Sequence, residues 1–465
     1  MRLVAIGGSD AGISAALRAR ELDPTADVTV IVADAYPNFS ICGIPYHVSG
    51  DVPDWHDLAH RTAAELVATG MHLLLDTRAE RIDADGHEVH VRDRSGAERV
   101  VGYDRLVIGT GALPQRPPID GLDLLGPDEG VHVLHSMVET FDLMRTLSSG
   151  AVTAALIIGA GYLGLEMAEA LRARGLRVTQ VEQLPEVLPT VDPELGELVA
   201  VELRSHGVDV ITGTTVHRIA RSSSGSAHPL VVHGSAADGS AFEHDVDVVL
   251  VFAGVRPDVE LAAAAGVTLG FRGAIDVNRE MRTNLPDVFA AGDCVVTHHR
   301  LLGTTYVPLG TTAHKQGRIA GENALGAHQE FAGSLGTQVV KVFDMVAART
   351  GLRDQEARNA GFDPLTVAAE ADDHKSYYPG SHRIAMRWTG DRQTGRLLGV
   401  QLFGHRHAEV AKRIDIAATA IFNDMRVAEM SELDLSYTPP LGSPWDAMQL
   451  GAQAWSRRTA TRVDG

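Results

Sequence analysis

Cys42 and Cys294 are the two thiol-bearing residues of the chain, and a thiol is its most direct means of redox chemistry. Two cysteines cannot build the disulfide framework of a small secreted domain, and this usage fits a reducing compartment. Any cysteine chemistry therefore uses one thiol or this single pair. Because the thiolate is the nucleophile, a reactive cysteine here is expected to have a lowered pKa, which a helix N-terminus would help to supply.

A glycine-rich turn near the N-terminus is the first candidate cofactor site. It joins a predicted strand over residues 3–6 to a predicted helix that ends near Glu21, and a second strand is predicted over residues 28–32. In such a unit, glycines let the backbone approach a pyrophosphate at the N-terminus of the helix. Ser9 replaces the middle glycine of the usual pattern. The predicted dinucleotide contacts are Gly7, Gly8, Ser9, Ala11 and Gly12.

A second turn of the same kind contains the complete three-glycine pattern. It lies between a predicted strand over residues 155–158 and a predicted helix that ends near Arg174. The next predicted strand, residues 178–181, is followed by Glu182. A carboxylate at that place accepts hydrogen bonds from a ribose, which favours NADH over NADPH. The glycines of this turn are Gly159, Gly161 and Gly164.

Two later segments suit a flavin. A buried strand over residues 104–108 leads into a turn of small residues that contains Thr110 and Gly111. Another predicted strand ends in Gly292 and Asp293. The glycine there would let a flavin approach, and the carboxylate would bind a ribityl hydroxyl.

Length and composition describe an ordinary globular enzyme. The chain has 465 residues, enough for two or three domains, with 45% hydrophobic and 22% charged residues. Its formal net charge of −19 disfavours nucleic acid or an anionic membrane as the main partner. No apolar stretch approaches the length of a membrane span, and the chain begins in a predicted strand. We therefore expect a cytoplasmic enzyme without a signal peptide.

Periodicity predicts the elements that must hold these motifs in place. Short β-branched runs alternate with helical patterns, which indicates an α/β fold with parallel sheets. From about residue 331 the pattern changes to antiparallel strands, for example over residues 341–344 and 384–388, with an amphipathic helix pair over residues 408–430. We interpret this last part as an α+β domain. The tail after about residue 452 is expected to be short, polar and loose.

The order of these motifs resembles that of the FAD-dependent pyridine nucleotide-disulfide oxidoreductases over residues 1–450. Within them, the chain is most similar to the coenzyme A-disulfide reductase and NADH oxidase branch, in which the first glycine motif also lacks its middle glycine. The segments that carry the similarity are Ser-Ile-Cys-Gly-Ile-Pro-Tyr at 40–46 and residues 308–318, 377–380, 412–415 and 436–440.

The resemblance implies two Rossmann-like dinucleotide-binding domains and a C-terminal α+β dimerisation domain. The FAD-binding domain would comprise residues 1–113 and 258–325, the NAD(P)H-binding domain residues 114–257, and the dimerisation domain residues 326–450, followed by a tail over 451–465. The implied cofactors are FAD and NADH, with NADPH possible. Added to the residues above, the implied cofactor contacts are Asp34 for FAD and Tyr162, Glu166 and Gly254 for NAD(P)H.

The resemblance also implies a single-cysteine mechanism. Relatives with a dithiol carry C-x-x-x-x-C beside the flavin, whereas position 47 here is His47. Cys42 would alternate between a thiolate and a mixed disulfide, persulfide or sulfenic acid, while Cys294 is interpreted as structural. Members of the branch are homodimers, so Tyr437, with Tyr377 or Tyr378, would approach Cys42 of the partner subunit.

Several positions depart from the pattern of the branch. Ile41 and Leu441 replace an Asn and an aromatic residue, which weakens the expectation of coenzyme A as the specific carrier. Val32 stands where an acid for the FAD ribose is expected, with Asp34 as its substitute. Asp10 stands where peroxidase-type and oxidase-type relatives often have His, which favours a thiol-releasing reaction. The closely spaced histidines at 298–299 and 405–407 are interpreted as surface residues, and no metal site is predicted.

The leading functional hypothesis is therefore an NADH-dependent reductase of a small disulfide or persulfide that uses Cys42. One alternative is an NADH oxidase or peroxidase that works through a cysteine sulfenic acid. The other is an NADH-dependent reductase that passes electrons directly from FAD to a ferredoxin- or rubredoxin-like protein. This last hypothesis needs neither Cys42 nor the segment around Tyr437.

Overall fold

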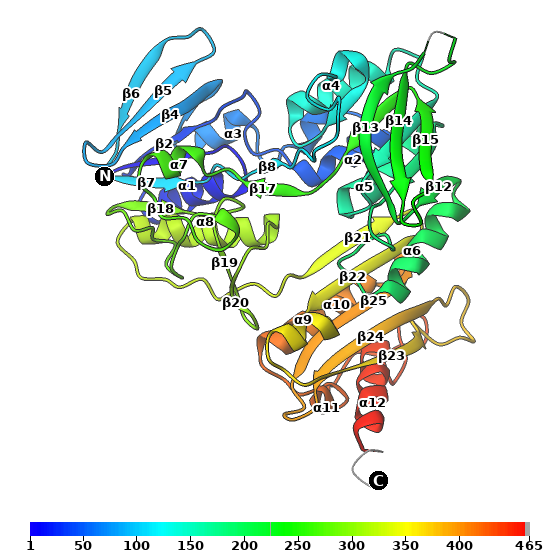
Figure 1. Ribbon diagram of the computed structural model, residues 1–465. Helices are drawn as coiled ribbons and strands as arrows, with labels where there is room; N and C mark the ends of the chain where they lie inside the picture. Colours follow the sequence, from blue (N-terminus) through cyan, green and yellow to red (C-terminus); the bar gives the residue numbers. More distant parts are fainter. Residues whose placement is uncertain (224, 461–465) are drawn as a thin grey trace.

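A computed structural model describes residues 1–223 and 225–460, which form three parts (Figure 1). Two parts contain a central parallel sheet, and the third, in yellow to red, contains an antiparallel sheet. The predicted α/β class with a C-terminal α+β part is confirmed. Residues 461–465 of the predicted tail lie outside the described residues.

The first part is built on a five-stranded parallel sheet that takes strands from two stretches of chain. In spatial order the strands are β18 (Val288–Ala290), β7 (Arg105–Ile108), β1 (Arg2–Ile6), β2 (Asp27–Ile31) and β3 (His72–Leu74). Their apolar side chains, such as Leu3 and Val107, are fully buried. The carboxyl ends of β1, β7 and β18 therefore meet at one edge, where the turns after these strands lie together.

Two helices pack on one another beside this sheet. They are α1 (Asp10–Leu22) and α8 (Gly310–Ala324). A Cβ atom added at Gly317 would lie 2.2 Å from the carbonyl oxygen of Ala11, so only glycine permits this approach. The close packing brings side chains about 300 residues apart in sequence, such as Ser14 and His314, into hydrogen-bonding distance.

Smaller elements surround the first sheet. A flanking antiparallel sheet contains β4 (Thr77–Asp83), β5 (Glu88–Asp93) and β6 (Glu98–Gly102). The segment between β2 and β3 contains the 3-10 turns η1 (Ile41–Gly43) and η2 (Trp55–Leu58) and the helices α2 (Ile44–Ser49) and α3 (Ala63–Ala68). Later elements are α7 (Glu260–Ala264), η4 (Phe271–Gly273), β19 (Thr297–His299) and β20 (Gly303–Thr305).

The second part repeats the parallel architecture. Its strands, in spatial order, are β12 (Val208–Ile211), β11 (Arg177–Val181), β10 (Ala154–Ile158), β16 (Val248–Val251) and β9 (Val131–Val133). Its helices are α4 (Met137–Leu147), α5 (Tyr162–Ala173) and α6 (Pro193–Ser205), with η3 (Pro127–Glu129) before β9. An antiparallel sheet of β13 (Thr214–Arg221), β14 (Leu230–Ala236) and β15 (Ala241–Val246) lies against it, and the pair β8 (Ala112–Pro114) and β17 (Val255–Pro257) joins it to the first part.

The third part is a five-stranded antiparallel sheet with helices against it. In spatial order the strands are β21 (Gln338–Val342), β22 (Met345–Gly351), β25 (Leu397–His405), β24 (Arg383–Asp391) and β23 (Pro364–Asp372). The helices are α9 (Asp354–Asn359), α10 (Val410–Phe422), α11 (Val427–Met430) and α12 (Ala447–Ala460), with η5 (Arg406–Ala408) before α10. The helix pair predicted over residues 408–430 is confirmed. The strand predicted over residues 341–344 ends at Val342, because Phe343 turns with a φ of 52°.

The expectation of a loose tail after residue 452 is wrong as far as residue 460. These residues continue α12, and Trp455 on this helix is 4% exposed. Its ring nitrogen donates a hydrogen bond of 2.8 Å to the carbonyl oxygen of Leu365 on β23. A Cβ atom at Gly390 would lie 2.6 Å from the Trp455 ring, so a glycine in β24 makes room for it. The tail looks polar because only its small residues and one tryptophan face the sheet.

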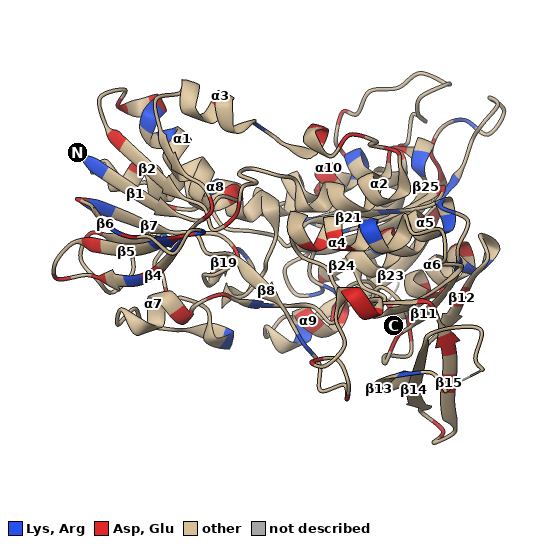
Figure 2. Cartoon of the chain, turned by 90° about the horizontal axis from the view of Figure 1, so that it is seen from above, with Lys and Arg blue, Asp and Glu red and all other residues tan. Residues whose placement is uncertain are grey.

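The surface charge is spread over all three parts. Lys and Arg are interspersed with Asp and Glu along the elements rather than collected on one face (Figure 2). Among the described residues, no helix is both long and apolar enough to cross a membrane.

Replacing Trp455 with Ala should lower the free energy of unfolding by about 3–5 kcal/mol, because it leaves a cavity between α12 and the sheet. Denaturant unfolding followed by circular dichroism measures the change. Gln453→Ala on the same helix is the control. A Trp455→Ala variant as stable as this control would show that α12 does not stabilise the third part.

Candidate active site

The first glycine turn has the backbone geometry of a dinucleotide site. Gly7 has a φ of 117°, and its N–H donates to the carbonyl oxygen of Ile31. A Cβ atom there would lie 2.0 Å from the carbonyl oxygen of Gly109, so only glycine at this position lets the turns after β1 and β7 approach so closely. Ser9 caps α1 without a side-chain hydrogen bond. The amides of the first turn of α1 are thus not taken by a capping side chain and can bind an anion.

The turns after β7 and β18 surround the same edge of the sheet. Thr110 donates its hydroxyl to the carbonyl oxygen of Asp258, and Gly111 has open space where a Cβ would lie. Gly292 has a φ of 91°, and its N–H donates to Gln316. Burial, followed by the charge of Asp10, raises the pKa of Asp293 to about 6.

Unsatisfied polar atoms at this edge fit a bound cofactor with hydroxyl and amide groups. The amide oxygen of Asn38, next to Gly8, and the amide nitrogen of Gln316, next to Gly292, are both buried without a partner. Such atoms are costly to bury unless a ligand or water satisfies them. Asp293 likewise lies where a hydroxyl donor would relieve its burial. The residues therefore fit FAD.

The predicted substitute for the ribose acid is engaged in its own turn. Asp34 accepts a hydrogen bond of 2.9 Å from the N–H of Tyr36, and burial raises the pKa of its carboxyl. Val32 fills the space beside Gly8, since a Cβ atom at Gly8 would lie 2.4 Å from its Cγ1. Val32 thus packs against the glycine turn at the place where the sequence pattern would put an acid.

The second glycine turn repeats this geometry on the other parallel sheet. Gly159 has a φ of 101°, and a Cβ atom on Gly164 would lie 2.2 Å from its carbonyl oxygen. Gly161 has open space where its Cβ would lie. Glu182 is 6% exposed and accepts 2.8 Å and 2.9 Å hydrogen bonds from the N–H groups of Ala160 and Leu184. The carboxylate is therefore held at the glycine turn, where a ribose would lie.

Three predicted nicotinamide-side residues lie near this second turn. Tyr162 opens α5, and its hydroxyl oxygen accepts a hydrogen bond from Thr190. Glu166, one turn later, accepts a 3.4 Å hydrogen bond from the Tyr46 hydroxyl on α2, and burial raises its pKa to about 7. Gly254 has a φ of 90° in the loop between β16 and β17.

Cys42 lies in η1, directly before α2, and is exposed. Surrounding protein atoms nevertheless desolvate the sulfur and raise its pKa, and the charges of Glu166, Asp10 and Asp293 raise it further. The lowered pKa expected from the sequence is therefore not produced by the chain's own groups. The reason is that burial of the sulfur, together with three carboxylates, raises its pKa, and a single short helix does not offset these effects.

The two other positions that bear on a possible dithiol, His47 and Cys294, are both buried. His47 is 7% exposed, and its Nδ1 lies 2.9 Å from the carbonyl oxygen of Val52. Cys294 is fully buried, and burial raises its pKa to about 11. Its Sγ lies 3.4 Å from the carbonyl oxygen of Ala291. Cys42 is therefore the one accessible thiol among the described residues.

Comparison with known proteins agrees with this arrangement. The pyridine nucleotide-disulphide oxidoreductase model matches residues 1–317, and the dimerisation domain of the same family matches residues 337–448. The chain belongs to the pyridine nucleotide-disulphide oxidoreductases. As in other proteins of this family, its cofactors are FAD and NAD(P)H.

Members of the family with similar sequences span nearly the whole chain. The NAD(P)H sulfur oxidoreductase (CoA-dependent) of Pyrococcus furiosus is 36% identical over 96% of this chain and 97% of its own. The NADH oxidase of Methanocaldococcus jannaschii is 31% identical over 97% and 98%. The structure of an NAD-dependent persulfide reductase from A. fulgidus superposes with a TM-score of 0.91 at 36% identity, covering 99% of this chain and 84% of that one.

The tyrosines predicted at the site of this oxidoreductase form a separate group on the third part. Tyr377, Tyr378 and Tyr437 are 72%, 43% and 45% exposed, and the hydroxyls of Tyr377 and Tyr437 interact. Within the described residues of one chain, no hydrogen bond or ring contact joins them to Cys42. One chain alone therefore does not bring the predicted catalytic residues together.

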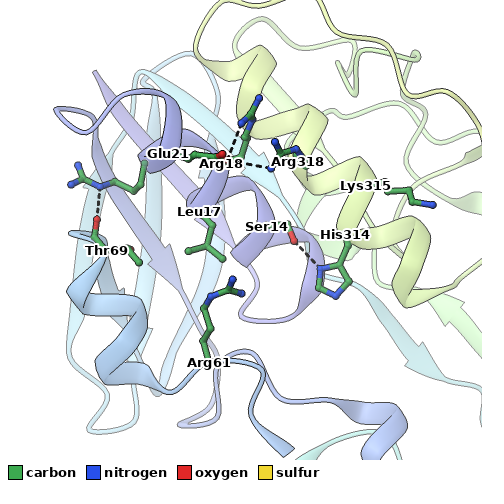
Figure 3. A pocket seen from close by; sticks show the side chains of 10 residues that line it. Ser14, Leu17, Arg18, Glu21, Arg61, Thr69, His314, Lys315 and Arg318 are labelled. Atoms are coloured by element: carbon green, nitrogen blue, oxygen red, sulfur yellow. Dashed lines mark hydrogen bonds and ion pairs between the residues drawn. The ribbon is translucent and has the colours of Figure 1, made fainter.

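A cationic cavity that the sequence motifs do not reveal lies between α1 and α8 (Figure 3). It has a volume of about 650 Å³ and is lined by Ser14, Leu17, Arg18, Arg20, Glu21, Arg61, Thr69, His314, Lys315 and Arg318. Four of these residues recur at positions 14, 17, 18 and 21 of α1, the spacing of one helical face. That spacing indicated a shared polar face on α1. The lining residues from α8 join this face only through packing between segments about 300 residues apart, which the sequence does not reveal.

Replacing Glu182 with Ala should narrow the preference for NADH over NADPH about tenfold, because the carboxylate that would repel a 2′-phosphate is removed. Steady-state kcat/KM for both nucleotides measures the ratio, with the neighbouring exposed Gln183→Ala as the control. A wild-type enzyme that already prefers NADPH would contradict the role of Glu182.

Replacing Glu166 with Gln should change how stability depends on pH. Between about pH 4.5 and 7 the folded protein holds a proton on Glu166 that the unfolded chain has released, so the free energy of unfolding falls as pH rises. Glutamine removes this pH dependence, and its amide oxygen can still accept the hydrogen bond from the Tyr46 hydroxyl. The variant should match wild type near pH 4.5 and exceed it by at most about 3 kcal/mol above pH 7.

Thermal unfolding at several pH values measures this difference, with the exposed Glu98→Gln as the control. A constant offset between Glu166→Gln and wild type across the pH range would contradict the raised pKa of Glu166.

Proposed function

We propose that this enzyme uses NADH to reduce a persulfide or disulfide carried by coenzyme A, with Cys42 as the sulfur that exchanges with the substrate. The observation that carries the proposal is the cationic cavity between α1 and α8, whose lining residue His314 pairs with Asp10, and the charge of Asp10 acts on Cys42. FAD would carry the electron pair from the nicotinamide to the sulfur. The function is thus a thiol-releasing reduction.

The charges of the cavity suit a polyanion. Arg18 forms ion pairs with Glu21 and Glu322, and Arg318 forms one with Glu21. Within the described residues, Arg61 and Lys315 make no side-chain hydrogen bond or ion pair, so both cations are available to a ligand. Guanidinium and ammonium groups in a concave site are the usual partners of phosphate.

Coenzyme A has the chemistry that this cavity requires. Its nucleotide end carries three phosphate groups, and a flexible arm ends in the thiol. Phosphates held between α1 and α8 would leave that arm free to extend toward Cys42. The names of the sulfur oxidoreductases of Pyrococcus also contain coenzyme A, including a coenzyme A polysulfide/persulfide reductase that is 34% identical to this chain.

The chemistry at Cys42 requires an exposed sulfur and an oriented neighbour. Cys42 is exposed, and α2 holds the adjacent Tyr46 against Glu166. Because burial and the chain's own carboxylates raise the pKa of Cys42, formation of the thiolate would depend on stabilisation by the bound cofactor. In the cycle, the Cys42 thiolate would attack one sulfur of the substrate's S–S bond, the other sulfur would leave as a coenzyme A thiolate, and the new bond to Cys42 would then be reduced by the electron pair from NADH.

A homodimer would complete this site. The third part contains the dimerisation domain of the family, and its exposed Tyr377 and Tyr437 have no contact with Cys42 in one chain. We propose that they approach Cys42 of the partner subunit and orient the leaving thiol. We also assign FAD to residues 1–113 and 258–325, NADH to 114–257 and the subunit interface to 326–450, and place the enzyme in the cytoplasm, where NADH and reduced thiols coexist.

The experiment measures NADH oxidation and thiol release with coenzyme A disulfide, coenzyme A persulfide, glutathione disulfide and oxygen. Wild type should be fastest with the coenzyme A substrates. Cys42→Ser should lose thiol release but still accept hydride from NADH. Arg61→Ala and Lys315→Ala should each raise KM for coenzyme A substrates about tenfold with little change in kcat, whereas Arg94→Ala on the remote β5–β6 turn should not.

Two outcomes would contradict the proposal. If Cys42→Ser reduces disulfides at the wild-type rate, the electrons reach the substrate by a route that does not use this sulfur. NADH consumption driven by oxygen, without thiol release from any substrate, would instead support an NADH oxidase.

A further inference from the structure

Asp10 and His314 form a carboxylate–imidazole pair that the mechanism above does not use. Asp10 is the first residue of α1, and its Oδ1 lies 3.3 Å from Nε2 of His314 on α8. The other ring nitrogen, Nδ1, lies 2.9 Å from the hydroxyl oxygen of Ser14. Both ring nitrogens of His314 thus face side chains of α1, and the interaction with Ser14 is visible in Figure 3.

The pair connects the cationic cavity to the reactive sulfur. His314 lines the cavity, and its side chain is 45% exposed, whereas that of Asp10 is 22% exposed. The N–H of Asn38 donates to the carbonyl oxygen of Gly8, so the segment before Cys42 meets the turn before Asp10, and the charge of Asp10 helps to raise the pKa of Cys42. The charged and titratable groups around the pair are His60, Arg61, Lys315, Arg318, Asp293 and Cys42.

The carboxyl of Asp10 lies close to the start of α8. The helix begins at Gly310, and a Cβ atom there would lie 3.0 Å from Oδ2 of Asp10. The ring of His60 lies 6.0 Å from that of His314, so a second imidazole borders the pair. Burial raises the pKa of Asp10, while His314 and His60 lower it, which suits a group that exchanges a proton.

We propose that Asp10 and His314 relay a proton from solvent to the sulfur that leaves Cys42. The proposal rests on the proposed function, because it needs a thiolate to be released at Cys42. His314 takes up the proton at its exposed face, and Asp10 passes it inward. Protonation of the outer sulfur as the bond breaks releases it as a neutral thiol, which opposes the reverse step in which the bond re-forms and the electron pair is given back.

The step balances in atoms and charge. The bond between Sγ of Cys42 and the outer sulfur breaks when the electron pair supplied by NADH enters it. Cys42 keeps the charge of a thiolate, and the outer sulfur takes the proton from the relay and leaves as a thiol. Solvent then restores the proton to His314. For each bond reduced the two sulfurs take up one proton and two electrons, NADH supplies the electrons as it becomes NAD+, and the proton left from its hydride would return to solvent.

The test uses the holoenzyme and follows the two half-reactions separately by stopped flow. His314→Ala should leave flavin reduction by NADH within about twofold of wild type and slow thiol release from coenzyme A disulfide about 10²-fold. Added imidazole should restore at least about tenfold of this loss, and the pH dependence of thiol release should flatten. Asp10→Asn should slow the same step without imidazole rescue.

A matched control exists in the same part of the protein. His72 on β3 lies 3.6 Å from Asp27 in an exposed carboxylate–imidazole pair at the start of β2, so His72→Ala should behave as wild type. A His314→Ala variant that releases thiol as fast as wild type would overturn the proposal. A slow variant with an unchanged pH profile and no response to imidazole would also overturn it and make His314 a packing residue.

Different results would contradict the proposed function and the proton relay. If Cys42→Ser still reduces coenzyme A disulfide, the proposed function fails and the relay fails with it. If Cys42→Ser is inactive while both His314→Ala and Asp10→Asn release thiol at the wild-type rate, only the relay is overturned.

Discussion

The packing of α5 against its neighbours fixes the three parts of this enzyme relative to one another. Its N-terminus forms the second glycine turn, and one face packs on α2, which follows Cys42. On the same helix Glu166 accepts a hydrogen bond from Tyr46, and Glu169 pairs with Lys341 on β21 of the third part. The backbone N–H of Phe343 also donates to Glu169. One helix therefore positions the nucleotide, the thiol and the dimerisation domain together.

The carboxylates that act on Cys42 and the cations that line the cavity are two separate groups. Glu166, Asp10 and Asp293 raise the pKa of the thiol, which opposes a permanent thiolate. Beyond Asp10 lies a cavity lined by arginine and lysine side chains. An anionic carrier would be attracted to the cations and would bring its sulfur to a thiol that the cofactor can activate.

The parts of the fold that depend on local backbone constraints could be predicted from the sequence. Gly7 and Gly159 adopt positive φ values where strands meet helices, and this requirement is visible as a glycine pattern. The buried carboxylate of Glu182 follows from its place after β11 in the same way. Both parallel sheets and the antiparallel third part were also evident from periodicity.

The parts that depend on packing over long sequence separations could not be predicted. Ser14 meets His314 across 300 positions, and Trp455 reaches Leu365 across 90. The raised pKa of Cys42 has the same origin, because Glu166 and Asp293 lie far from it in sequence. The helical part of the tail could not be predicted because the buried face of α12 mixes small residues with a methionine, a glutamine and a tryptophan, which gives no strong amphipathic pattern.

The most direct test of the account is the covalent state of Cys42. The oxidised enzyme is incubated with a slight excess of coenzyme A disulfide and then digested for mass spectrometry, with and without a subsequent addition of NADH. The account predicts one coenzyme A in disulfide linkage on the peptide that contains Cys42, and its complete release by NADH. An adduct on Cys294, no adduct, or an adduct that NADH does not release would contradict it.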